Sequence, residues 1–172
     1  KEKGLAHVPE DRQRMGLVTD FKAYENLIFG YHHQEPFSKS SILKEKEILS
    51  FSKKVMEEYD VRPRSPNLIT SNFSGGNQQK IILSRELNEN PKVLLVGQPT
   101  RGVDIGAIEF IHQRLIDMRD KGAAILLVSV ELEEVLSLSD RIIVMFDGNI
   151  VGEKINKDVT DRELGLLMAG VA

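Results

Sequence analysis

Four short apolar runs bounded by turn residues constrain the fold of this 172-residue chain more than any other feature. Apolar runs of this length are typical of strands buried in a sheet. Between the second and third runs, Ile105 to Asp120 carries apolar residues at helical spacing and is followed by Lys121-Gly122, a helix stop. Strand, helix and strand in this order predict a right-handed parallel crossover, and therefore an α/β fold. The runs are residues 5–8, 93–96, 123–129 and 142–146.

The rest of the chain predicts smaller elements around this core. Asp147-Gly148 follows the last run and predicts a tight hairpin with residues 149–153. Residues 15–90 have no convincing strand but contain a helical stretch at about 41–59, so we expect an inserted helical subdomain. Thr160-Asp161-Arg162-Glu163 predicts a capped start for a short final helix at 164–168. The expected organisation is a core of residues 1–14 and 91–157, a helical subdomain of 15–90 and a C-terminal helix within 158–172.

Composition excludes several classes of function. The net charge of −3 is spread along the chain without a basic stripe, which disfavours a nucleic-acid partner. Without cysteine there is no disulfide or thiolate metal site, and the isolated histidines predict no other metal site. No apolar run approaches the roughly 20 residues that cross a bilayer. Because a strand begins almost at Lys1, we expect the chain to be a segment of a longer one.

The stretch Ser74-Gly75-Gly76-Asn77 lies directly before a helical segment at residues 78–87. The start of a helix offers unpaired amides and a positive dipole end, and two glycines let an anion approach those amides closely. Phosphate recognition is the natural use of this arrangement. Taken alone, the same residues describe an ordinary capped helix and a turn, so the assignment depends on their surroundings.

Those surroundings resemble a known family. Residues 72–80 are followed by an apolar strand at 93–96 that leads into Gln98-Pro99-Thr100 and Gly102-Val103-Asp104. This order is similar to the signature motif, Walker B strand and D-loop of the ATP-binding-cassette (ABC) ATPases. Glu10 then takes the position of the family's Q-loop glutamine. The resemblance covers nearly the whole chain and implies a partial RecA-like P-loop NTPase core, mainly parallel, with an inserted α-helical signature subdomain.

Several residues depart from the family's pattern. No Gly-x-x-x-x-Gly-Lys-Ser/Thr phosphate loop occurs in the sequence, and we expect it upstream. The Asp-Glu pair that ends the Walker B strand is replaced by Gly97 and Gln98, and the switch histidine by Val130. Glycine offers no carboxylate, and glutamine cannot accept a proton from water. We therefore expect the ATP site of this half to be degenerate. The alternative is a half in which Gln98 and a rearranged site still hydrolyse ATP.

The resemblance also implies a role in another site. Ser74, Gly75, Gly76 and Asn77 would complete, in trans, the ATP site of a partner cassette, with ATP and Mg²⁺ bound only in the full assembly. Asp104 would lie in the loop that couples the two sites. An N-cap of the following helix is an equally good interpretation of this residue. A third alternative is a non-catalytic scaffold that contacts membrane subunits.

Finally, the resemblance extends to one branch of the family. Residues 9–12, 99–102 and Asn77 resemble the second cassette of fused ATPases in bacterial simple-sugar importers, and residues 98–102, 105–111 and 163–170 resemble the nucleoside branch. This implies that the partner cassette is the N-terminal half of the same polypeptide. Transmembrane permease subunits would be further partners, with residues 15–31 as one candidate docking surface. It also implies a peripheral place on the cytoplasmic face of the membrane, and it favours a nucleoside over a sugar as solute.

Overall fold

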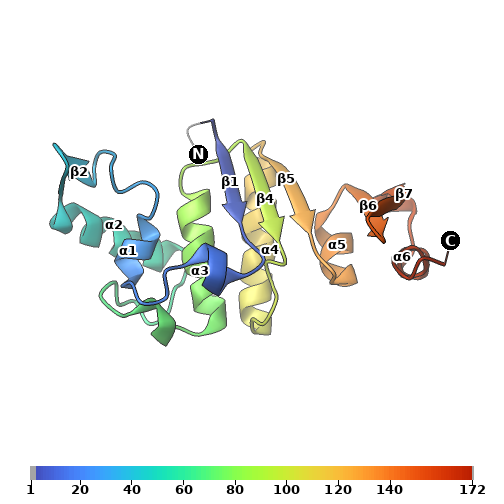
Figure 1. The fold of residues 1–172 in the computed structure, drawn as a ribbon, viewed down its shortest axis with the longest axis horizontal. Helices are drawn as coiled ribbons and strands as arrows, with labels where there is room; N and C mark the ends of the chain where they lie inside the picture. The colour runs from blue at the N-terminus through green and yellow to red at the C-terminus, as the bar shows by residue number, and fades with distance from the viewer. Residues whose placement is uncertain (1–2, 172) are drawn as a thin grey trace. The chain divides into compact units, whose positions relative to one another are not determined.

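The computed structural model describes residues 3–171, and they form the α/β arrangement expected from the sequence (Figure 1). The chain divides into two compact units, Lys1–Leu126 and Leu127–Ala172. The first unit contains a sheet with helices beside it, and the second contains a hairpin and two helices. The domain bounds expected from the sequence remain a prediction. No helix within residues 3–171 is long and apolar enough to cross a membrane.

The sheet of the first unit has the strand order β1-β4-β5. Strands β1 (Leu5–Val8) and β4 (Val93–Gly97) are parallel, with Leu5 opposite Val93 and Val8 opposite Val96. Strand β5 (Ala124–Val128) adds to this pair at the edge. The strands predicted at 5–8, 93–96 and 123–129 are therefore confirmed to within one or two residues at each end.

The sheet is buried on one face only, although the sequence predicted burial on both. Ala6, Val8, Leu94 and Val96 point to the buried face, next to helices α3 and α4 (Figure 1). The alternate residues are half-buried or exposed, and Leu126 on β5 is 58% exposed. The prediction was wrong because continuous apolar runs do not reveal how many layers cover a sheet; strand period alone cannot distinguish one covering layer from two.

Helix α4 (Ile105–Asp120) has the bounds expected from the sequence. Asp104 is its N-cap, and the carboxylate accepts a hydrogen bond from the amide of Ala107 at 2.9 Å. Gly122 follows the end of the helix, and its φ of +94° favours glycine. Its buried residues recur at intervals of three or four: Ala107, Ile111, Leu115 and Met118. The sequence pattern predicted the last three, and it predicted Ile108, which is half-buried, in place of Ala107.

The helical region between β1 and α3 departs from the sequence prediction at one point. Helix α2 (Glu45–Glu58) starts four residues later than expected, because a short antiparallel pair precedes it, β2 (Ser38–Lys39) and β3 (Ile42–Leu43). Ser40 and Ser41 form its turn with φ of 51° and 65°. The expectation of no strand here was wrong, since two successive serines in left-handed backbone are uncommon and carry no clear signal in a sequence.

A small apolar cluster holds this helical region together. Helix α1 (Ala23–Leu27) leads into Ile28 and Tyr31, which pack with Phe37 and with Ile48 of α2. Burial raises the pKa of the Tyr31 hydroxyl to about 12, since the phenolate would lose its hydration. The region therefore has a core of its own beside α3.

Helix α3 (Gly75–Leu87) is buried on nearly all sides, whereas the sequence predicted one buried face. Its buried ion pair is bonded to other elements. Arg85 donates to the carboxylate of Glu86 at 2.8 Å and to the carbonyl of Gly16 at 2.8 Å. The backbone N–H of His7 on β1 donates to the other carboxylate oxygen of Glu86 at 3.4 Å. The Arg85–Glu86 pair thus joins α3 to strand β1 and to the segment that follows β1.

The second unit is built on the hairpin that the sequence predicted. Strands β6 (Arg141–Phe146) and β7 (Asn149–Ile155) are antiparallel, with a bulge between Val144 and Met145. Asp147 and Gly148 form the turn with φ of 46° and 74°. These strands form a sheet of their own, so the expectation of one core sheet from all four runs was wrong for the last run.

Two helices cover the hairpin. Helix α5 (Leu132–Leu138) and helix α6 (Asp161–Met168) surround a cluster of Ile142, Val144, Leu164 and Leu167. Thr160 caps α6 in the predicted manner: its hydroxyl accepts from the amide of Glu163, and that carboxylate accepts from the amide of Thr160. The final helix starts three residues earlier than expected.

The Arg85–Glu86 pair generates a testable prediction about stability. Glu86→Gln leaves Arg85 as a buried charge without a counter-charge, and we expect it to lower the free energy of unfolding by about 3–5 kcal/mol. Glu89→Gln, at an exposed position just beyond the same helix, is the control and should change it by less than about 0.5 kcal/mol. Urea unfolding of both variants checks this. Equal stability of the two would contradict the assigned role of the pair.

Candidate functional site

Ser74 lies exposed at the first turn of α3, and Asn77 and Arg62 fix its orientation. It is the N-cap of the helix and accepts from the amide of Asn77 at 3.5 Å. The Asn77 side-chain amide donates to Ser74 Oγ at 2.8 Å, and its carbonyl oxygen accepts from the backbone N–H of Arg62 at 2.6 Å. Because Oγ accepts these bonds, its single hydrogen is available to a group outside the helix.

A charged cluster holds the loop that contacts Asn77. Arg62 donates to the carboxylate of Asp60 at 2.8 Å, and Lys80 of α3 donates to the Asp60 carbonyl at 3.0 Å. The hydrogen bond from Arg62 holds the pKa of the Asp60 carboxyl below its usual range, and the charge of Lys80 adds to this. The network therefore connects the 60–62 turn to the same helix that presents Ser74.

Gly75 and Gly76 are needed for packing inside the chain. A Cβ added at Gly75 would lie 2.9 Å from the carbonyl oxygen of Gly102 and 2.7 Å from Nη2 of Arg12. A Cβ at Gly76 would lie 3.0 Å from both Ala107 Cβ and Asp104 Oδ2. The first turn of α3 therefore packs directly on the loop and helix that follow β4. Gly76 is buried there, and Gly75 is half-buried.

The loop after β4 turns sharply in front of this helix. Gln98 and Gly102 both have positive φ, +45° and +66°. The amides of Arg101 and Val103 donate to the carbonyls of Gln98 and Thr100 at 3.2 and 3.3 Å. Asp104 closes the loop as the N-cap of α4, so the cap interpretation of this residue is confirmed. The loop is thus held by its own backbone bonds and by the start of α4.

Position 97 is tightly packed in this arrangement. A Cβ at Gly97 would lie 3.1 Å from the backbone nitrogen of Glu10 and 3.4 Å from its Cβ. The Glu10 carboxylate is ion-paired with Arg101 at 2.9 Å. No group of three His, Asp or Glu side chains in the described part of the chain could hold a metal ion. Gly97 and Gln98 therefore supply no carboxylate to a Mg²⁺ ion at the end of β4.

The structure brings most of the predicted site residues into one region. Glu10, Gly97 and Gln98 lie at the carboxyl ends of β1 and β4, and they are continuous with the loop that packs on residues 74–77. Val130, the position of the missing switch histidine, belongs to the second unit, where it is 65% exposed. Its place in the site remains a prediction.

Sequence reasoning missed two residues of this region, Arg12 and Arg62. Arg12 donates to the carbonyls of Arg101 and Gly102, and Arg62 supplies the backbone amide that holds Asn77. Both contacts use main-chain groups distant in sequence, so residue type and local spacing carry no signal for them. The sequence did show Pro63 and Pro66 after Arg62, and two prolines so close together indicate a loop there.

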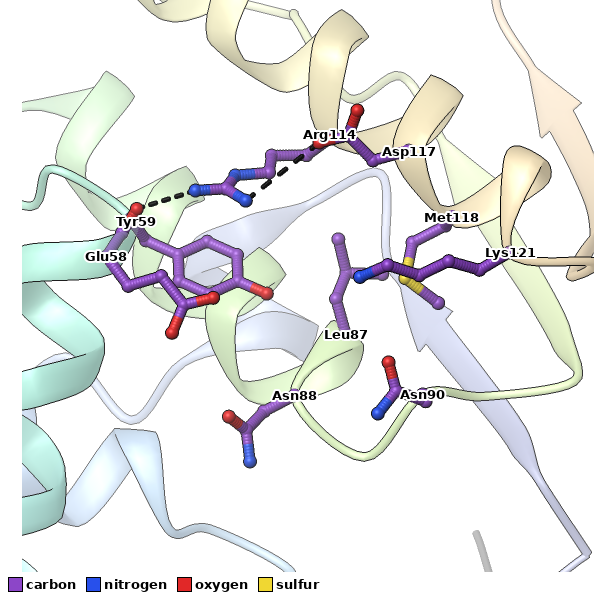
Figure 2. Close-up of a pocket in the computed structure, with 9 residues that line it drawn as sticks. All are labelled: Glu58, Tyr59, Leu87, Asn88, Asn90, Arg114, Asp117, Met118 and Lys121. Atoms are coloured by element: carbon purple, nitrogen blue, oxygen red, sulfur yellow. Dashed lines mark hydrogen bonds and ion pairs between the residues drawn. The ribbon is translucent and has the colours of Figure 1, made fainter.

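A polar hollow of about 210 Å³ lies elsewhere, where the C-terminal ends of α2, α3 and α4 meet (Figure 2). Arg114 spans it, donating to the carbonyl of Glu58 at 2.6 Å and lying over the ring of Tyr59 at 4.7 Å. Burial raises the pKa of Tyr59. The hollow is at the opposite end of α3 from Ser74, roughly 18 Å along the helix axis. It is therefore separate from the site.

Known proteins are similar over nearly the whole chain. It is 46% identical over 169 residues to the guanosine import ATP-binding protein NupO of Bacillus subtilis (strain 168), and 48% identical over 169 residues to the nucleoside import ATP-binding protein NupA of Lactococcus lactis subsp. cremoris (strain MG1363). The ribose import ATP-binding protein RbsA of Oceanobacillus iheyensis is 35% identical over 161 residues. The first two alignments cover 98% of this chain, so it spans about a third (33%) of the length of those relatives. No protein-family model matches the chain.

Solved structures agree on the fold. An ATP-binding cassette of an ABC transporter superposes with a TM-score of 0.72 at 25% identity, covering 96% of this chain and 68% of that one. A nucleotide-free cassette gives a TM-score of 0.70 at 22% identity, with 98% and 66% covered.

The two glycines generate a stability prediction. Gly75→Ala places a methyl group against a backbone carbonyl that cannot move aside easily, and we expect a loss of roughly 1–3 kcal/mol in the free energy of unfolding. Gly106→Ala, whose nearest neighbour would be Asp104 Oδ1 at 3.5 Å, is the matched control. It should be neutral or stabilising by up to about 1 kcal/mol, because alanine favours a helix. Chemical unfolding measures both, and a harmless Gly75→Ala would refute the close packing.

The Asp60 cluster generates a prediction about pH. Since the folded-state pKa of Asp60 is depressed, its contribution to stability is complete above the unfolded-state pKa and disappears as pH falls through the folded-state value. Arg62→Ala should raise the pKa of Asp60 towards its usual value, as seen in an NMR titration of the carboxyl carbon. The stability difference from the unsubstituted protein should shrink below about pH 4. Arg64→Ala, whose guanidinium is 3.9 Å from Asp60, should shift it less.

Proposed function

Because the chain belongs to the ABC transporter ATPase family and spans part of one cassette, we propose that it presents the signature motif, Ser74 to Asn77, to an ATP site of a partner cassette. The observation that carries this proposal is the exposed Ser74 hydroxyl at the start of α3, oriented by Asn77. A hydroxyl donor, a half-buried glycine amide and the positive end of a 13-residue helix suit a terminal phosphate.

The roles within the motif differ from residue to residue. Ser74 donates to the phosphate, and Gly75 lets it approach the helix amides. Gly76 keeps α3 close to Asp104 and Ala107, and Asn77 orients Ser74. Asp104 couples the motif to α4 and to the loop after β4. These assignments remain proposals, supported by the packing of the described residues.

The half that contains this chain contributes little hydrolysis of its own in this proposal. Gly97 has no carboxylate, and the Gln98 amide cannot take a proton from water. The active site served by Ser74 therefore takes its catalytic residues from the other cassette. When the two cassettes close on ATP, this motion moves the transmembrane permease subunits. The protein lies at the cytoplasmic face of the membrane as a peripheral subunit.

The proposed solute is a nucleoside. The higher identity is to the guanosine and nucleoside import proteins, 46% and 48%, against 35% for the ribose import protein. The partner cassette is proposed to be the N-terminal half of the same polypeptide, because the chain spans about a third of each relative's length and a second cassette fits in the remainder.

ATP hydrolysis by the full-length protein with its membrane subunits tests the proposal. Ser74→Arg fills the place of the phosphate and removes its donor, so we expect turnover to fall by at least about 100-fold. Ser50→Arg, at an exposed position in α2, is the matched control and should leave turnover unchanged. Loss of about half the activity would instead indicate two working sites, and no loss would indicate a scaffold. The assay uses guanosine as the transported solute. Replacing guanosine with ribose tests whether the solute is a nucleoside.

A further inference from the structure

Arg12 connects two parts of the site that are far apart in the sequence. It begins a π-helical turn, η1 (Arg12–Gly16), directly after Asp11, whose carboxylate accepts from the amides of Gln13 and Arg14. From there the guanidinium reaches the loop after β4. Nη1 donates to the carbonyl of Arg101 at 2.6 Å, and Nη2 donates to the carbonyl of Gly102 at 3.2 Å. The planar fork of the guanidinium therefore holds two successive carbonyls of one loop.

The same guanidinium lies against two glycines. A Cβ at Gly75 would lie 2.7 Å from its Nη2, and a Cβ at Gly102 would lie 3.4 Å from it. Its Nε is buried and has no hydrogen-bond partner within residues 3–171, so the side chain is packed in place and not extended into solvent. Arg12 thus lies between the first turn of α3 and the loop, in contact with both.

Backbone carbonyl dipoles stabilise the charge of Arg12. Among the described residues no carboxylate forms an ion pair with it, whereas the neighbouring Arg101 pairs with Glu10 at 2.9 Å. Residues 10–12 and 101–102 are therefore linked twice. Arg12 bonds to the carbonyls of the second segment, and Arg101 of that segment bonds to Glu10. The Arg101–Glu10 pair is exposed on both sides, and exposed pairs contribute little.

The far end of η1 is also attached to α3. The carbonyl of Gly16 accepts from Arg85 at 2.8 Å, and a Cβ at Gly16 would lie 2.5 Å from Cδ1 of Ile82. The segment from Arg12 to Gly16 is therefore held against the signature helix at both ends. Only the Arg12 end extends this attachment to the loop after β4.

We propose that Arg12 is a positioning residue for the site completed by Ser74. Its guanidinium holds the Arg101–Gly102 peptide against the first turn of α3, so that the signature motif and the loop with Asp104 meet the partner cassette as one rigid surface. This inference rests on the proposed function and adds a residue outside the signature motif to it. Loss of the fork frees the loop while Ser74, its cap and its hydrogen bonds remain.

The test compares Arg12→Ala, Arg12→Lys and Arg14→Ala in the full-length protein with its membrane subunits. For Arg12→Ala we expect kcat for ATP hydrolysis to fall between about tenfold and a hundredfold with little change in KM, because alignment and not phosphate binding is lost. Arg12→Lys keeps the charge but can reach only one carbonyl, so it should be intermediate. Arg14→Ala, on the same turn and exposed, should match the unsubstituted protein.

Hydrogen exchange provides a second, independent measurement. The amides of Arg101 and Val103, bonded within the loop at 3.2 and 3.3 Å, should exchange several-fold faster in Arg12→Ala, with the thermal midpoint hardly changed. A lower midpoint with normal turnover per folded molecule would mean that Arg12 is merely structural. Full activity of Arg12→Lys would mean that only its charge matters. Either result overturns the proposal.

The outcome separates this inference from the proposed function. If Ser74→Arg abolishes turnover while Arg12→Ala has normal turnover and normal exchange, only the role of Arg12 is wrong. If Ser74→Arg has no effect, the site in trans is wrong, and the exchange of the loop amides then decides by itself whether Arg12 orders the loop.

Discussion

The burial of α3 on nearly all sides is the constraint on which the first unit depends. A helix so placed must satisfy its polar side chains internally, since an unpaired buried charge would cost several kcal/mol. The Arg85–Glu86 pair does this with bonds to Gly16 and to the backbone of β1. The same bonds fix the direction of the helix. Its first turn, with Ser74 exposed, therefore has a defined position next to the loop after β4.

The glycines of the signature motif have two physical requirements. An anion can approach amides that carry no side chain, which is the reason that the sequence suggested. The structure adds a second reason, because Gly75 and Gly76 are the places where α3 touches Gly102, Asp104 and Ala107. In the proposed function, the absence of carboxylates at Gly97 and Gln98 is consistent with this packing, because a half that does not hydrolyse ATP would still present a rigid surface to its partner.

An element of the fold could be predicted when the residues that specify it lie close together in the sequence. Helix α4 was predicted to the residue because its apolar spacing, the Asp104 cap and the Gly122 stop all lie within one segment. The hairpin around Asp147-Gly148 was predicted for the same reason. The turn at Ser40 and Ser41 was missed because serine rarely adopts left-handed backbone. The exposure of one sheet face was missed because the residue pattern along a strand does not show whether one layer or two cover the sheet.

The sequence by itself determined the family, the order of the motifs and the chemical types at Ser74, Gly97 and Gln98, because these are properties of residues and of their local spacing. Only the tertiary structure decided what those residues touch. The fork of Arg12 on the Arg101–Gly102 peptide joins residues about 90 positions apart, and the Asn77 amide meets a backbone N–H 15 positions away. Both bonds use main-chain groups, which every residue carries, so they become specific only when folding brings the backbones together.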